Sequence, residues 1–248
     1  MRAMVTAGSD LASSHRAVSI AEMYDNVYAA VGFHPHEARH MAEGDLAALR
    51  ELASHPKVVA IGEIGLDFYR DRSPRDVQLA AFRRQLLLAA DLGLPVVVHA
   101  RDAEEAVEAE LTAWSTEHAT QHPRALLHCF SGNLAQARRY VDLGFLLSLA
   151  GPLTYPRNER LHAVARGLPL SALTIETDAP YLPPQRYRGQ RNEPCYLLAT
   201  AERLAALRDD SFDAIAEATA NNAARLFRLP LPVGRHSLTV GKPTATPA

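Results

Sequence analysis

The chain has 248 residues, 48% of them hydrophobic and 22% charged, and its formal net charge is −2. This is enough apolar material for one large core. The near-neutral charge argues against a protein that coats nucleic acid through a general basic field, but not against a nuclease with a local basic rim. The two cysteines have no framework spacing, and no apolar run is long enough to span a membrane, which favours a cytoplasmic protein.

Apolar runs that predict strands alternate with helical stretches along almost the whole chain. The runs are continuous, as is typical of strands that are buried on both faces. The pattern predicts an α/β fold, a TIM-type (β/α) barrel in one domain at residues 1–228, followed by a disordered tail at residues 229–248. Seven strands are visible, one fewer than such a barrel needs to close. They are Ala3–Ala7, Val27–Gly32, Val58–Gly62, Pro95–His99, Ala125–His128, Gly144–Ser148 and Leu173–Glu176.

Helices are predicted between most of these strands. In Arg75–Leu92, apolar residues recur on one helical face and Gly93 follows as a stop. Asn133 is expected to cap a later helix. Two further helices, near Pro194–Leu207 and Ser211–Phe227, are predicted to complete the domain.

Four polar residues stand at the ends of four predicted strands: Glu63, His99, His128 and Asp178. All strands of a parallel barrel end on the same face, so these side chains are expected to converge there. Two imidazoles and two carboxylates suit a hydrolytic divalent ion such as zinc, manganese or magnesium. The sequence therefore predicts a metal-dependent hydrolase, in which Asp178 also orients or deprotonates the attacking water.

Each of these residues also has an ordinary structural interpretation. Glu63 could form a structural salt bridge, the two histidines could be satisfied core residues, and Asp178 could cap the turn before Pro180. A second group is predicted to bind substrate or to support the ligands, with a loop or salt-bridge role as the alternative. Within it, Glu176 is expected to hold a histidine ligand by a hydrogen bond. The group is His34, His36, Asp67, Arg101 and Glu176.

Two loops that follow predicted strands combine arginine with tyrosine. Arginine beside aromatic rings suits phosphate contact and base stacking, although a solvated loop is the alternative. The first loop contains Tyr69, Arg70, Arg72 and Arg75, and the second contains Tyr181, Arg186, Tyr187, Arg188 and Arg191.

The chain contains five motifs in the order in which a known family carries them. They are Val-Gly-Phe-His-Pro-His (31–36), Gly-Glu-Ile-Gly-Leu-Asp-Phe-Tyr (62–69), Val-His-Ala-Arg-Asp-Ala (98–103), His-Cys-Phe-Ser-Gly (128–132) and Glu-Thr-Asp-Ala-Pro-Tyr-Leu (176–182). From about Val5 to Phe227 the chain resembles the TatD family of metal-dependent deoxyribonucleases. The resemblance implies an amidohydrolase-type barrel that hydrolyses phosphodiester bonds in DNA at one or two divalent ions. It also implies that the ligands are Glu63, His99, His128 and Asp178.

The chain departs from the family pattern at its start. Family members normally begin with a strand that ends in His-x-His, followed by a first helix, and those histidines serve one metal position. This chain opens at what resembles the second strand. His34 and His36 have His-x-His spacing but belong to a separate motif, so we do not expect them to replace the missing pair. The expectation is an N-terminally incomplete barrel with weakened activity.

Two other functions remain open from the sequence. A small-molecule or aminoacyl-ester hydrolase could use the same site, because fold does not decide function. The chain could also be a catalytically impaired, truncated remnant. The preferred prediction is a monomeric deoxyribonuclease with DNA as substrate, no obligate protein partner and no membrane association.

Overall fold

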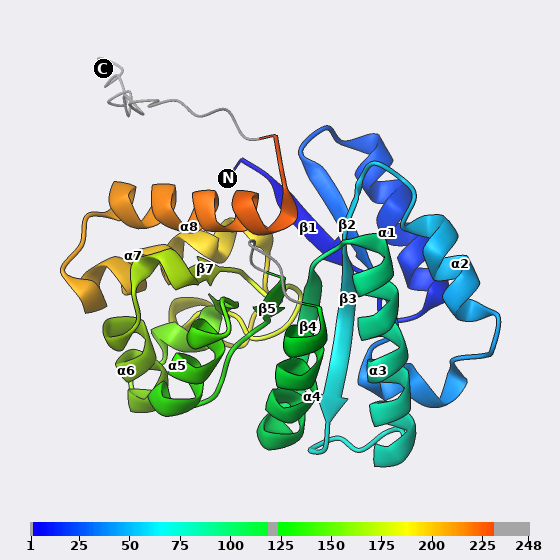
Figure 1. Cartoon of the computed structure of the whole chain (residues 1–248). Coiled ribbons are helices and arrows are strands. Elements are labelled where there is room, and N and C mark those ends of the chain that lie inside the picture. Colours follow the sequence, from blue (N-terminus) through cyan, green and yellow to red (C-terminus); the bar gives the residue numbers. More distant parts are fainter. Residues whose placement is uncertain (1, 119–123, 231–248) are drawn as a thin grey trace, which may run out of the picture.

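The computed structural model describes residues 2–118 and 124–230, and a sheet of seven parallel strands lies at its centre (Figure 1). Strand order in the sheet follows the sequence. The sheet is curled into a half-barrel with helices outside it, which confirms the predicted TIM-type α/β fold and its seven strands for these residues. The tail predicted to be disordered comprises residues 229–248, and its part after residue 230 lies outside the described residues. The strands are β1 Met4–Ala7, β2 Val27–Val31, β3 Val58–Asp67, β4 Val96–Arg101, β5 Ala125–Leu127, β6 Leu146–Leu149 and β7 Leu173–Ile175.

Capping residues explain one limit of each of two helices. The long helix α3 spans Arg75–Leu92, as predicted, and it ends because Gly93 adopts the left-handed conformation with φ of 64°. Asn133 caps helix α5 (Leu134–Asp142) by accepting a hydrogen bond from the backbone N–H of Gln136, also as predicted. No described helix is long and apolar enough to cross a membrane. The remaining helices are α1 Leu11–Met23, α2 Asp45–Leu52, α4 Glu104–Glu117, α6 Glu159–Gly167, α7 Leu197–Arg208 and α8 Phe212–Phe227.

In most strands of the sheet, alternate residues face two different apolar clusters. In β4, Val96 and Val98 belong to the large cluster shared with the outer helices, whereas Val97 belongs to a smaller one. The smaller cluster includes Leu226 and Phe227 of α8, which crosses the end of the sheet where the strands begin (Figure 1). Since side chains alternate along a strand, the residue two positions after Val97 lies on the same inner face, beyond this cluster. That residue is His99.

Strand β3 carries one extra residue in the middle of its pairing with β4. Ile61 pairs with Val96 and Ile64 pairs with Val98, so three steps on β3 match two on β4. Such a bulge changes which side chains face each side of the sheet. Ile61 and Ile64 consequently share the large outer cluster although they are an odd number of residues apart. Glu63 lies in the irregular stretch between them.

Candidate metal centre

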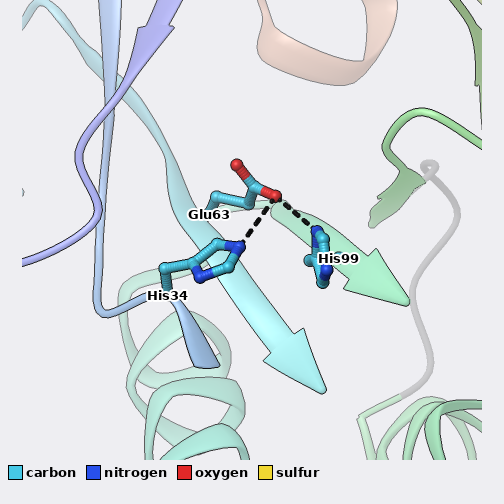
Figure 2. A group of neighbouring side chains, drawn as sticks. All are labelled: His34, Glu63 and His99. Atoms are coloured by element: carbon cyan, nitrogen blue, oxygen red, sulfur yellow. Dashed lines mark hydrogen bonds and ion pairs between the residues drawn. The ribbon is translucent and has the colours of Figure 1, made fainter. Parts of the chain in front are cut away.

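One oxygen of Glu63 is the centre of the site. The Oε1 atom lies 2.9 Å from His99 Nδ1, 3.5 Å from His34 Nε2 and 3.6 Å from His128 Nε2. Figure 2 shows His34 and His99 reaching this oxygen from different elements, the loop after β2 and strand β4. One donor atom from each of His34, Glu63 and His99 lies within 4.8 Å of the other two, which is close enough for one ion.

His34 reaches Glu63 because buried side chains fix the backbone just before it. Ser14 of α1 bonds both the N–H and the carbonyl of Gly32, at 3.2 and 3.4 Å. Gln85 of α3 accepts from the N–H of Phe33 at 2.7 Å and donates to its carbonyl at 3.1 Å. Both clamps are fully buried, so they define the direction in which the chain leaves β2.

A buried carboxylate at the end of β3, that of Asp67, contacts one further imidazole, His36, and also His99. Asp67 Oδ2 lies 2.7 Å from His36 Nε2 and 3.2 Å from His99 Nε2. Its other oxygen accepts hydrogen bonds from the backbone N–H groups of Tyr69 and Arg70, at 3.0 and 2.7 Å. Every oxygen of Asp67 therefore has a partner, and the ring of His99 is held between Glu63 and Asp67.

His128 has its own supporting carboxylate. Its Nδ1 lies 2.9 Å from the Glu176 carboxylate, which also accepts a hydrogen bond from the backbone N–H of Cys129 at 2.7 Å. Its Nε2 lies 3.5 Å from Asp178 Oδ1 and faces Glu63. A carboxylate on one ring nitrogen fixes the orientation of the other nitrogen, as is common for metal-bound histidines.

The loop that carries Asp178 is clasped by one buried amide. Asn192 is 1% exposed, and its Nδ2 donates to the carbonyl oxygens of Thr177 at 2.6 Å and Tyr181 at 2.5 Å. Its backbone N–H donates to the carbonyl of Pro180 at 3.2 Å. These three bonds enclose Asp178, whose backbone has φ of 57°, a conformation that is uncommon outside glycine. Asn192 is therefore well placed to position Asp178.

The ionisable groups of the centre shift one another's pKa. Burial raises the pKa of Glu63, but the neighbouring imidazoles outweigh burial and hold it well below its ordinary value. The pKa of Asp67 is lowered in the same way, by hydrogen bonds from His99, a backbone N–H and His36. Burial lowers the pKa of His99 and His128, yet the adjacent carboxylates more than compensate and raise both. The centre thus favours positive charge on His99 and His128, where protons and a cation compete for the same nitrogens.

The donor set fits a divalent ion. Imidazole nitrogens and carboxylate oxygens are ligands for zinc, manganese and similar ions. The side chains of His34, Glu63, His99, His128 and Asp178 are only 12–23% exposed, so their charges are partly desolvated and need a partner. A cation among them would provide that partner.

The structure brings the sequence-predicted residues together with one exception. Arg101 stands at the rim, with its guanidinium carbon 4.0 Å from the centre of the Tyr69 ring. The expected strand-end positions hold only in part: Glu63 lies inside β3, His99 lies inside β4, and His128 follows β5 directly. His34 was expected only near substrate or ligands, and the structure places it among the candidate donors themselves.

A sequence model described as TatD related DNase matches residues 1–228 of the chain. The chain belongs to this family. The match confirms the family that the five motifs indicated. The matched residues include all the candidate ligands of the centre.

Several relatives cover nearly the whole chain. The uncharacterized metal-dependent hydrolase YabD of Bacillus subtilis is 42% identical over 226 residues, which is 91% of this chain and 87% of the relative. The 3'-5' ssDNA/RNA exonuclease TatD of Edwardsiella piscicida is 38% identical over 235 residues, 92% of this chain and 89% of the relative. The crystal structure of YjjV, a TatD homologue from Escherichia coli, has a TM-score of 0.86 and 33% identity, covering 93% and 88% of the two chains.

Gly65→Ala is expected to disturb the TatD-family centre by direct overlap. Gly65 has φ of 137°, and a Cβ built on it would collide with the carbonyl oxygen of its register partner His99. Overpacking costs about 1–3 kcal/mol, so the melting temperature should fall and manganese affinity should fall about tenfold or more. Gly93→Ala is the control, because Gly93 also has positive φ but its Cβ would meet no atom within 4 Å. Equal behaviour of the two variants in calorimetric metal titration would argue against this packing role.

Asn192→Ala is expected to lower both stability and turnover. Removing a buried donor that serves two carbonyl groups costs about 1–3 kcal/mol. The same substitution at Asn222 is a matched control, since its buried amide also donates to two carbonyls, of Leu170 and Leu173, at 2.8 Å each, but at the start of β7. Denaturant unfolding should show similar losses of stability for both variants. Only Asn192→Ala should also lower kcat, by about tenfold or more, because only its carbonyls flank Asp178.

Proposed function

We propose that this protein is a divalent-metal-dependent nuclease that hydrolyses phosphodiester bonds in DNA. The observation that carries the proposal is the single Glu63 oxygen approached by three imidazoles, in a chain of the TatD-related DNase family. The names of the curated relatives, a metal-dependent hydrolase and 3'-5' ssDNA/RNA exonucleases, support the same reaction class. We take single-stranded DNA as the first substrate to test.

In this proposal the ion is held by donors from five side chains. When bound, it would supply a Lewis acid for a phosphoryl oxygen and lower the pKa of an attacking water. The candidate ligands are His34, Glu63, His99, His128 and Asp178.

The remaining groups of the chain have supporting roles. Asp178 would accept the proton of the attacking water, because its carboxylate lies at the centre and is 23% exposed. Glu176 and Asp67 orient His128 and His99 through the hydrogen bonds described above. Arg101 at the rim would contact phosphate.

We also propose that residues 1–228 act as one catalytic unit without a protein partner. The large apolar cluster runs from Ala17 to Ile215, and all the candidate donors come from one chain. A monomer is therefore sufficient to build the centre.

The decisive experiment distinguishes hydrolysis of phosphodiesters from hydrolysis of carboxylic esters. Protein stripped with a chelator and reloaded with manganese, magnesium or zinc would be assayed on labelled single-stranded DNA, duplex DNA and a panel of aminoacyl and small esters. We expect no hydrolysis before reloading and DNA cleavage after it. Rapid ester cleavage with intact DNA would instead favour a small-molecule or aminoacyl-ester hydrolase, and hydrolysis of DNA in excess chelator would remove the metal from the proposal.

A further inference from the structure

The two arginine–tyrosine loops differ in how far their rings are already occupied. In the loop after β7, Tyr187 stacks on Tyr196 with ring centres 3.7 Å apart and planes at 7°. Arg186 of the same loop pairs with Glu202 at 2.8 Å. Arg186 and the Tyr187 ring therefore already have partners within the protein. Tyr181 of the same loop is 69% exposed, but among the described residues no arginine lies against its ring.

The loop after β3 presents an open ring. Tyr69 is 57% exposed, and Arg101 lies against its ring at 4.0 Å, with Arg70 farther away at 5.7 Å. Arg101 can reach the ring because it is the register partner of Asp67, so the ends of β3 and β4 lie side by side. A guanidinium against a tyrosine face is a cation–π contact, which holds the ring in place and keeps positive charge beside it.

The backbone at Tyr69 is hydrogen-bonded to a residue of the metal centre. Asp67 accepts hydrogen bonds from the N–H groups of Tyr69 and Arg70 through one oxygen, and it contacts His36 and His99 through the other. One buried carboxylate therefore orients a candidate ligand and anchors the exposed ring. The ring is accordingly held at the rim of the centre.

We propose that Tyr69, backed by Arg101, is a stacking platform for one unpaired nucleobase of a single-stranded nucleic acid whose backbone enters the metal centre. The proposal rests on the nuclease function proposed above and adds the part of the substrate that this rim recognises. Every base offers a π-face, so stacking is tolerant of sequence, but a base inside a duplex has both faces covered by its neighbours. The adjacent guanidinium groups match the phosphates that flank such a base. The platform therefore gives preference for single strands without reading sequence.

Binding to a base can be separated from binding to a backbone with two probes. One is a short fluorescein-labelled thymidine oligonucleotide, and the other has the same length and label but abasic residues throughout. Anisotropy titrations in EDTA, which is expected to prevent metal-dependent cleavage, would compare the wild-type protein with Tyr69→Leu and Tyr69→Trp. Tyr24→Leu is the matched control, because Tyr24 is 54% exposed but lies before β2, at the opposite end of the sheet.

We expect Tyr69→Leu to weaken binding of the thymidine oligonucleotide by roughly 5- to 150-fold, the range found when a stacking aromatic is removed. Its affinity for the abasic oligonucleotide should equal that of the wild type, Tyr69→Trp should retain base-dependent binding, and Tyr24→Leu should match the wild type on both probes. Equal losses on the two probes, or no loss at all, would overturn the platform. If the reloaded wild type still cuts DNA in that case, the nuclease function stands and the platform alone fails. If it neither binds nor cuts DNA, both proposals fail.

Discussion

Replacing Glu63 by glutamine is expected to lower kcat for DNA hydrolysis by roughly 10³-fold or more and to reduce bound manganese together with it. Glutamine keeps the shape but removes the charge that three imidazoles face within 3.6 Å. A bound ion stabilises the transition state by several kcal/mol, and each 1.4 kcal/mol corresponds to about tenfold in rate. Turnover at saturating manganese and metal content by mass spectrometry of the purified variant would measure both effects.

The control for this variant is Glu110→Gln. Glu110 is a carboxylate of similar burial, 16% exposed, but it pairs with Arg83 on the outer helices at 2.6 Å. It should keep full activity and metal content. A folded Glu63→Gln protein with normal turnover and a full complement of metal would show that Glu63 is not a ligand.

Replacing Asp178 by asparagine is expected to lower kcat by roughly 10²- to 10⁴-fold, the usual contribution of a positioned general base. The amide can still bond to neighbours but cannot accept the proton of the attacking water. Asp178 lies at the edge of the donor set, 3.5 Å from His128, so the other donors should retain an ion and DNA affinity should change little. Single-turnover kinetics with a parallel binding titration would separate the two quantities.

Asp91→Asn serves as the comparison for Asp178→Asn. Asp91 is 63% exposed and pairs with Arg50 at the surface, so its loss should leave the reaction unchanged. If Asp178→Asn cuts DNA as fast as Asp91→Asn under single-turnover conditions, another group accepts the proton.

The local sequence pattern was sufficient to predict most helices and strands, but not the extent of β3. Apolar periodicity and Gly93 predicted α3 at its observed limits, because a helix stop is a property of neighbouring residues. Strand β3 was expected to end at Gly62, yet it continues to Asp67 through a bulge. The bulge depends on pairing with β4, which brings the backbone of Gly65 against His99, and that pairing is not encoded in the local sequence of either strand.

The same distinction applies to the site. His99 and His128 were predictable because each follows an inward-facing strand residue, Val97 and Leu126, by two positions. The approach of His34 to Glu63 was not predictable, since it depends on distant side chains such as Gln85 that clamp the loop. The one local signal of this clamp was Gln85 itself, a polar residue on the buried face of α3. Asn192 gave no signal at all, because a polar residue in a proline-containing loop is ordinary in sequence.

We propose that the carboxylate of Glu63 and the surrounding imidazoles hold the catalytic ion. The most direct test is anomalous diffraction from crystals soaked in manganese, recorded for the wild type and for Glu63→Gln. In the wild type we expect a peak within about 2.0–2.3 Å of Glu63 and of at least two ring nitrogens among His34, His99 and His128. The peak should be lost in the variant. A peak bound elsewhere, or one that persists at full height in Glu63→Gln, would contradict this proposal.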